Sequence, residues 1–156
     1  MGKRISKLTD TVALQLSSMC SGNVVLMDKA KLMSDELERI NAIDEIIKNQ
    51  NHLMLNKVLH ATRAMDTGMR TFLELNNAMP NGQYSMGAYL KALKRGKGNS
   101  FNKLNAGLSD RIQSRVVDKR NILMHASGQF PTKSEAEQLV NDVVSYLQTI
   151  LNLKCL

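Results

Sequence analysis

The sequence predicts an all-α protein, an antiparallel bundle of four to five helices that forms one domain over residues 1–156. Only 4% of the residues are aromatic and none is Trp, whereas ten are Met. A core of Leu, Ile, Val and Met favours helices, because β-sheets prefer branched and aromatic side chains. No segment alternates polar and apolar residues for long enough to predict a strand. With 43% hydrophobic residues in 156, the chain can bury one core.

Apolar residues first recur at helical spacing in two stretches. The first stretch contains Leu32, Met33, Leu37, Ile40, Ile43 and Ile47. The second contains Leu55, Val58, Leu59, Met65, Met69, Phe72 and Leu73. The polar residues 48–51 between them indicate either a break between two helices or the exposed middle of one long helix.

Turn and capping residues divide the rest of the chain. "MPNG" at 79–82 predicts a turn, and a short basic helix over 84–96 is expected to end at Gly96, before the loop "GKGNS". Ser109 and Asp110 are expected to cap a helix that runs to about Ala126. Gly128 then provides its stop, and Pro131 prevents continuation.

The last helix has two overlapping start signals. Thr132 with Glu135, and Ser134 with Glu137, have the spacing of capping boxes. Apolar residues then recur at helical spacing and are expected to form the buried face: Leu139, Val140, Val143, Leu147, Ile150 and Leu151.

Positive charge is concentrated in one quarter of the chain. Residues 81–129 carry nine Lys or Arg against two Asp or Glu, whereas residues 1–80 carry ten against nine and residues 130–156 two against three. A localised basic region suggests a polyanionic partner, nucleic acid first and an anionic membrane second. The plainer alternative is a basic surface that serves solubility alone.

Several functional classes find no support in the sequence. Cys20 and Cys155 lack the spacing of a disulfide framework or a metal site, and the three histidines form no H-x-x-x-H pair. We therefore expect no metal and no cofactor, and we assign no catalytic role to His52 or His60. No run of eighteen apolar residues occurs, so no membrane span is expected and the predicted location is the cytoplasm.

Arg120 lies in the middle of an apolar helical face. When residues 109–126 are projected at about 100° per residue, Val116 and Leu123 lie about 40° and 60° to one side of Arg120, and Met124 and Val117 lie about 40° and 60° to the other. Asn121 and His125 lie together on one flank of this face, at about 100° and 140°. A guanidinium is thus expected where the helix should be buried.

A buried guanidinium without a partner costs several kcal/mol. Arg120 must therefore pair with an acid, extend to solvent, or face a cleft. The acids that we consider for such a pair are Glu74, Asp118 and Glu45. In the third case, the end of the apolar face leaves the core and meets another chain, so that Arg120 lines a cleft at a subunit interface.

The stretch "RNILMHASGQFP" at 120–131 resembles the signature of the HEPN family, an Arg followed after four to six residues by His. In that family the residue after the Arg is often Asn, as Asn121 is here. The similarity is close over residues 115–131 and otherwise extends to the helical architecture. It implies a homodimer that brings two Arg/His motifs into one cleft, and a metal-independent endoribonuclease, as in bacterial toxins and phage-defence effectors. A neutralising antitoxin or another defence protein would then be a further partner.

The residue types suit this chemistry. Histidine is the usual side chain for acid–base catalysis, so His125 could transfer protons; Arg120 could stabilise the charge on the phosphorus, and Asn121 could orient substrate or imidazole. The expected phosphate contacts come from the basic segment: Lys94, Arg95, Lys97, Lys103, Arg111, Arg115 and Lys119.

Two alternatives stay open. The domain could be a non-catalytic HEPN-like module that binds a partner protein, a nucleotide or nucleic acid, or it could be an unrelated basic helical nucleic-acid binder. Some family members carry a modified Tyr two residues after the His. Ser127 occupies that position here, so inactivation by tyrosine modification at that position is not expected for this chain.

Overall fold

The structure is a computed structural model that describes residues 2–155, with side chains from residue 7 onward except that of Glu45. Three long helices open the chain: α1 (Gly2–Met19), α2 (Val24–Ile46) and α3 (Gln50–Leu75). They are followed by α4 (Met86–Arg95), a helix composed of α5 (Ala106–Ile112), η1 (Gln113–Asp118) and α6 (Lys119–His125), and finally α7 (Lys133–Leu151). No β-strand occurs within residues 2–155, where only isolated bridges join Phe101 to Lys97 and to Lys154. The all-α prediction is confirmed.

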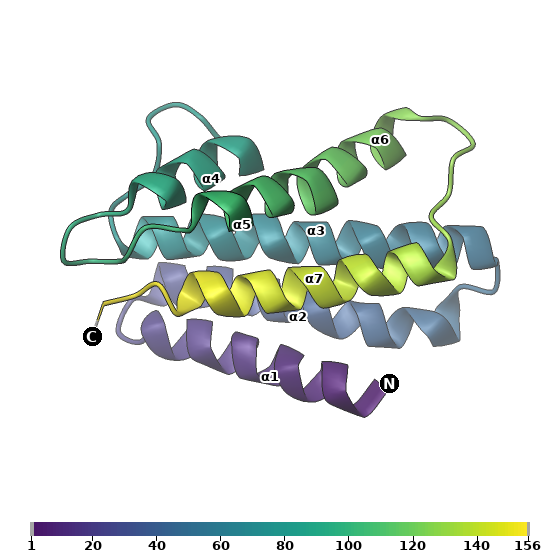
Figure 1. Cartoon of the computed structure of the whole chain (residues 1–156). Helices are drawn as coiled ribbons and strands as arrows, with labels where there is room; N and C mark the ends of the chain where they lie inside the picture. The colour runs from purple at the N-terminus through teal and green to yellow at the C-terminus, as the bar shows by residue number, and fades with distance from the viewer. Residues whose placement is uncertain (1, 156) are drawn as a thin grey trace.

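The six packed helices of the described chain exceed the predicted four to five. The helix that the prediction missed is α1, which buries Val12 and Leu16, with the buried Cys20 directly after its last residue. These residues are four apart and therefore lie on one helical face. The long helices alternate in direction along the chain (Figure 1). Helices α1, α3 and α7 run one way, and α2 and the helix from α5 to α6 run the other. The stretch 48–51 is a break, because α3 starts at Gln50 with Asn49 as its cap.

The centre of the bundle is α3, which packs against both α2 and α7. Gly68 allows this close approach. A Cβ atom at Gly68 would lie 2.5 Å from Leu147 Cδ2 and 3.0 Å from Met33 Sδ, closer than van der Waals contact permits. Met33, Leu147 and their neighbours Met65 and Met69 are fully buried.

The helix that carries Arg120 starts earlier than predicted. Its cap is Asn105, whose side chain accepts a hydrogen bond from the Leu108 N–H at 3.1 Å, so the start predicted at Ser109 and Asp110 is wrong. Ser109 is instead buried within the helix. The middle of the helix, Gln113–Asp118, is π-helical, a wider turn that often occurs near functional sites. The helix ends at His125, and Gly128 adopts a positive φ of 76° beyond it.

Of the two capping boxes predicted for α7, only the first forms. The Thr132 hydroxyl accepts a hydrogen bond from the Glu135 N–H at 3.1 Å, and the Glu135 carboxylate accepts one from the Thr132 N–H at 2.8 Å. The box predicted from Ser134 and Glu137 is wrong, because Lys133 already begins the helix. Among residues 2–155, no helix has both the length and the apolar character needed to cross a membrane.

Substitution of the cap residue tests where α7 starts. Replacing Thr132 with alanine should lower the free energy of unfolding by about 1 kcal/mol, because the Glu135 N–H loses its partner. Ser134→Ala is the matched control and should leave stability within about 0.5 kcal/mol of the wild type. Urea denaturation of the two variants compares them. Equal losses would contradict the assignment of the cap to Thr132.

Candidate functional site

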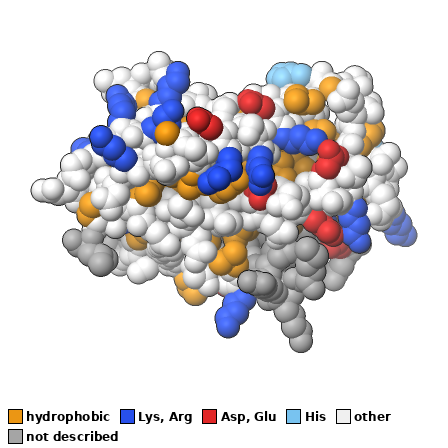
Figure 2. Space-filling view, in the orientation of Figure 1, with side chains coloured by type: hydrophobic (Ala, Val, Ile, Leu, Met, Phe, Trp, Pro, Cys, Tyr) orange, Lys and Arg blue, Asp and Glu red, His pale blue; other side chains and the backbone are white. Residues whose placement is uncertain are grey.

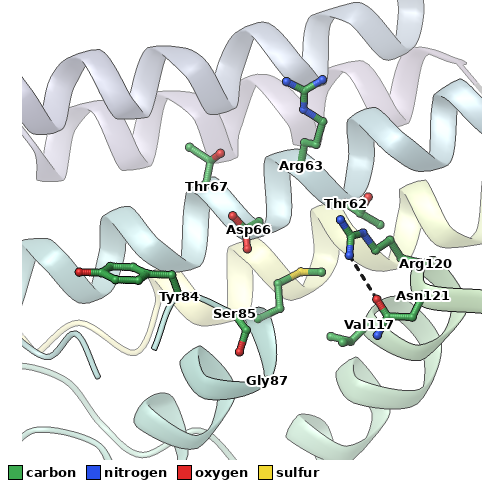
Figure 3. A pocket seen from close by; sticks show the side chains of 11 residues that line it. Thr62, Arg63, Asp66, Thr67, Tyr84, Ser85, Gly87, Val117, Arg120 and Asn121 are labelled. Carbon is green, nitrogen blue, oxygen red and sulfur yellow. Dashed lines mark hydrogen bonds between the residues drawn. The ribbon is translucent and has the colours of Figure 1, made fainter. Parts of the chain in front are cut away.

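A polar pocket of about 590 Å³ lies between α3, α4 and the helix that carries Arg120. Its lining comes from three places, as Figure 3 shows. Helix α3 contributes Thr62, Arg63, Asp66 and Thr67; the turn into α4 and its first residues contribute Tyr84, Ser85, Met86 and Gly87; and η1 and α6 contribute Val117, Arg120 and Asn121. Most of these side chains are hydroxyls, carboxylates or guanidinia, so the pocket suits a charged or polar ligand.

The projected apolar face is largely confirmed. Of the four residues projected beside Arg120, Val116, Val117 and Leu123 are buried, and Met124 is 36% exposed. Arg120 itself is half-buried, and its Nη1 donates a hydrogen bond to Asn121 Oδ1 at 3.2 Å. No carboxylate with a described position lies within 4 Å of its guanidinium. Arg120 therefore faces the pocket rather than an ion pair inside the bundle.

None of the three acids considered as partners is found beside Arg120. Glu74 pairs with Lys29 and with Arg70, and Asp118 accepts a hydrogen bond from Gln113 at 2.7 Å. The side chain of Glu45 lies outside the described residues.

Asp66 is the acid that shares the pocket with Arg120, and sequence reasoning missed it. It comes four residues before Arg70, a spacing that favours an ion pair along the helix surface. Arg70 instead bonds Glu74, with Nε 3.0 Å from Oε1. Burial raises the pKa of Asp66, and the positive charges of Arg70 and Arg120 offset this only in part.

The raised pKa of Asp66 predicts a pH-dependent effect. The fold favours the neutral carboxyl, and this stabilisation is fully present below the unfolded-state pKa of about 3.9 and is lost as pH rises through the folded-state pKa. Asp66→Asn should therefore raise the unfolding temperature relative to the wild type at neutral pH. The difference should vanish below about pH 4. Thermal unfolding across this pH range measures it, and a destabilised Asn variant at pH 7 would contradict the prediction.

His125 lies at the last residue of α6, exposed and outside the residues that line the pocket. Its imidazole forms no hydrogen bond or ion pair with any described side chain. One chain thus brings together Arg120 and Asn121 but not His125. His60, by contrast, is held structurally, because its Nδ1 lies 2.6 Å from Oε2 of the buried Glu36.

The basic residues predicted to contact phosphate fall into two groups. Three are engaged within the chain. Lys97 Nζ donates to the carbonyls of Asn76 and Asn77 at 2.8 and 2.6 Å, and Lys119 lies 2.6 Å from Glu135. Arg115 lies 3.8 Å from Asp142.

The other four predicted contacts, Lys94, Arg95, Lys103 and Arg111, are exposed and have no ion pair among the described residues. In Figure 2, Lys and Arg side chains gather at the end of the molecule where Figure 1 shows α4. Lys91 belongs to this surface although the prediction omitted it; it lines two shallow pockets beside Lys94.

Comparison with protein-family models, with curated proteins and with solved structures finds no match. The surroundings of Arg120 and the Arg-x-x-x-x-His motif therefore carry the functional argument.

Proposed function

We propose that the protein is a metal-independent endoribonuclease of HEPN type, acting as a toxin or a phage-defence effector. One observation supports it most directly. Arg120 interrupts an apolar helical face, yet its guanidinium lies in an open polar pocket with no acid paired to it. A cation in such a position is available to a phosphate.

The proposed reaction assigns one role to each residue of the motif. The 2′-hydroxyl attacks the adjacent phosphorus, His125 transfers protons to or from the reacting oxygens, and Arg120 stabilises the negative charge that develops. The hydrogen bond from Arg120 to Asn121 at 3.2 Å fixes one edge of the guanidinium. The products are a 2′,3′-cyclic phosphate and a 5′-hydroxyl.

A second copy of the chain would complete the site. His125 is exposed at the end of α6, flanked by the partly exposed apolar side chains of Ile122 and Met124. Exposed apolar residues beside a functional group are typical of an interface. We propose a homodimer in which the two α6 helices meet and both motifs line one groove. An antitoxin or other defence protein remains a proposed further partner.

Incubation of the purified protein with mixed single-stranded RNA in EDTA tests this function. We expect fragments with 2′,3′-cyclic phosphate and 5′-hydroxyl ends, because none of the proposed roles requires a metal ion. Intact RNA, or fragments with 5′-phosphate ends, would contradict the proposal.

The position of His125 outside the pocket favours one alternative, a non-catalytic module that binds a nucleotide or nucleic acid. In that case the protein would bind RNA through the Arg120 pocket and leave it uncut in the same assay.

A further inference from the structure

Tyr84 is the exposed aromatic side chain of the pocket. Its side chain lies on the turn before α4 and is 70% exposed, whereas Tyr89 and Tyr146 are buried. A ring this exposed is not held in place by burial, yet the Tyr84 ring is held by another contact. The Arg70 guanidinium lies 5.3 Å from the centre of the ring, within the range of a cation–π interaction.

The residues behind Tyr84 fix Arg70 in turn. Arg70 Nε donates to Glu74 Oε1 at 3.0 Å, and Glu74 also pairs with Lys29 of α2. Glu74 raises the pKa of Arg70, mainly through this hydrogen bond. The ring is therefore oriented by a chain of charged side chains anchored to two helices.

Tyr84 and Arg120 lie at opposite ends of the pocket, with Asp66 between them (Figure 3). One end thus presents an aromatic ring and the other a guanidinium. A nucleotide has the matching parts, a flat base and a phosphate. Bases in single-stranded nucleic acid stack on exposed aromatic rings whatever their sequence.

The surface continues from this pocket toward the basic end of α4. A neighbouring shallow pocket shares Ser85 and Gly87 with the first and reaches Lys91 and Lys94. A third shares Lys91 and Lys94 and reaches Arg95. The adjoining pockets form one path from Arg120 to three cations, which suits an extended polyanion.

We propose that Tyr84 is the stacking platform for an unpaired RNA base, placed so that a phosphate of the same strand lies at Arg120 while Lys91 and Lys94 bind phosphates farther along the strand. This inference rests on the proposed function. It adds the residue that selects unpaired RNA and the direction in which the strand leaves the site.

The test uses an RNA oligonucleotide of about ten nucleotides, a length within the usual site size. Its sugars are 2′-O-methylated so that it cannot be cleaved, and it carries one 2-aminopurine, whose fluorescence falls when it stacks. Wild type and Tyr84→Phe should bind it with the same affinity and quench it. Tyr84→Leu should bind about five-fold or more weakly and lose the quenching, because base–aromatic stacking contributes about 1–3 kcal/mol per base, a factor of about five or more. Lys133→Ala, at an exposed lysine on α7, is the matched control and should change neither.

Each outcome bears on one claim. Quenching by Tyr84→Leu at wild-type strength would overturn the stacking platform, even if the protein cleaves RNA. Stacking that depends on Tyr84 in a protein that cuts no RNA would support the platform and contradict the nuclease. With cleavable RNA, Tyr84→Leu should raise KM more than it lowers kcat, since the ring binds the base and not the reacting phosphate.

Discussion

Substitution of Arg120 by alanine should reduce RNA cleavage about 100-fold or more and change the unfolding temperature little. The loss follows from removing the cation that stabilises the phosphorus-centred charge. The small change in stability follows from the structure, because the guanidinium is half-buried and has one side-chain hydrogen bond, to its own neighbour Asn121, and Arg70 still offsets part of the burial of Asp66. Arg120→Lys keeps the charge but not the planar fork, so it should recover only part of the activity.

His125→Ala should reduce cleavage about 100- to 10 000-fold for a different reason, the loss of the proton-transferring group. Initial cleavage rates, thermal unfolding and light scattering on the same preparations separate activity, stability and the proposed dimer. Arg39→Ala is the matched control, since Arg39 is an exposed arginine on α2 with one weak ion pair. An Arg120→Ala protein that cuts RNA at the wild-type rate would end the nuclease assignment, and one that unfolds early would assign Arg120 to the fold.

Among the substitutions predicted here, those at the contact between α3 and α7 should change the free energy of unfolding most. Leu147→Ala should lower the free energy of unfolding by about 2–5 kcal/mol, because it leaves a cavity beside Gly68 in a fully buried region. Gly68→Val should cost about 1–3 kcal/mol by overpacking the same space. The double variant should lose less than the two single losses together, since the added methyl groups occupy part of the cavity.

Urea denaturation measures these three free energies. The control is Leu14→Ala on α1, the same change at a side chain that is 71% exposed, and it should alter stability by less than about 0.5 kcal/mol. Strictly additive losses in the double variant would contradict the direct contact of Gly68 with Leu147.

Local sequence patterns predicted a helix well where the pattern was compatible with one structure only. The spacing of Leu139, Val143, Leu147 and Ile150 placed the buried face of α7, and all four are buried. The prediction was wrong for the start of the helix that carries Arg120, because Asn105, Ser109 and Asp110 are all good caps. The choice depends on burying Ser109 and Ile112 against other helices, which local sequence does not encode.

Of the residues that line the pocket, the sequence predicted only Arg120 and Asn121 as site residues. Arg120 was conspicuous because its charge violated the apolar pattern around it. Asp66 and Tyr84 violate no pattern in their own segments, since an acid four residues before an arginine and a tyrosine in a turn are both ordinary. They become part of a site only because the fold carries α3 and the turn before α4 to the face of Arg120.

The π-helical turn Gln113–Asp118 bears on how this helix tolerates a change of length. Such a turn is equivalent to one additional residue within an α-helix. Removing one residue there would leave a regular α-helix with Arg120 still directed at the pocket, whereas removing one residue from a regular α-helical segment would rotate everything beyond it by about 100°. In the evolution of this segment, the π-helical turn is therefore a place where one residue can be gained or lost while the motif stays at its pocket.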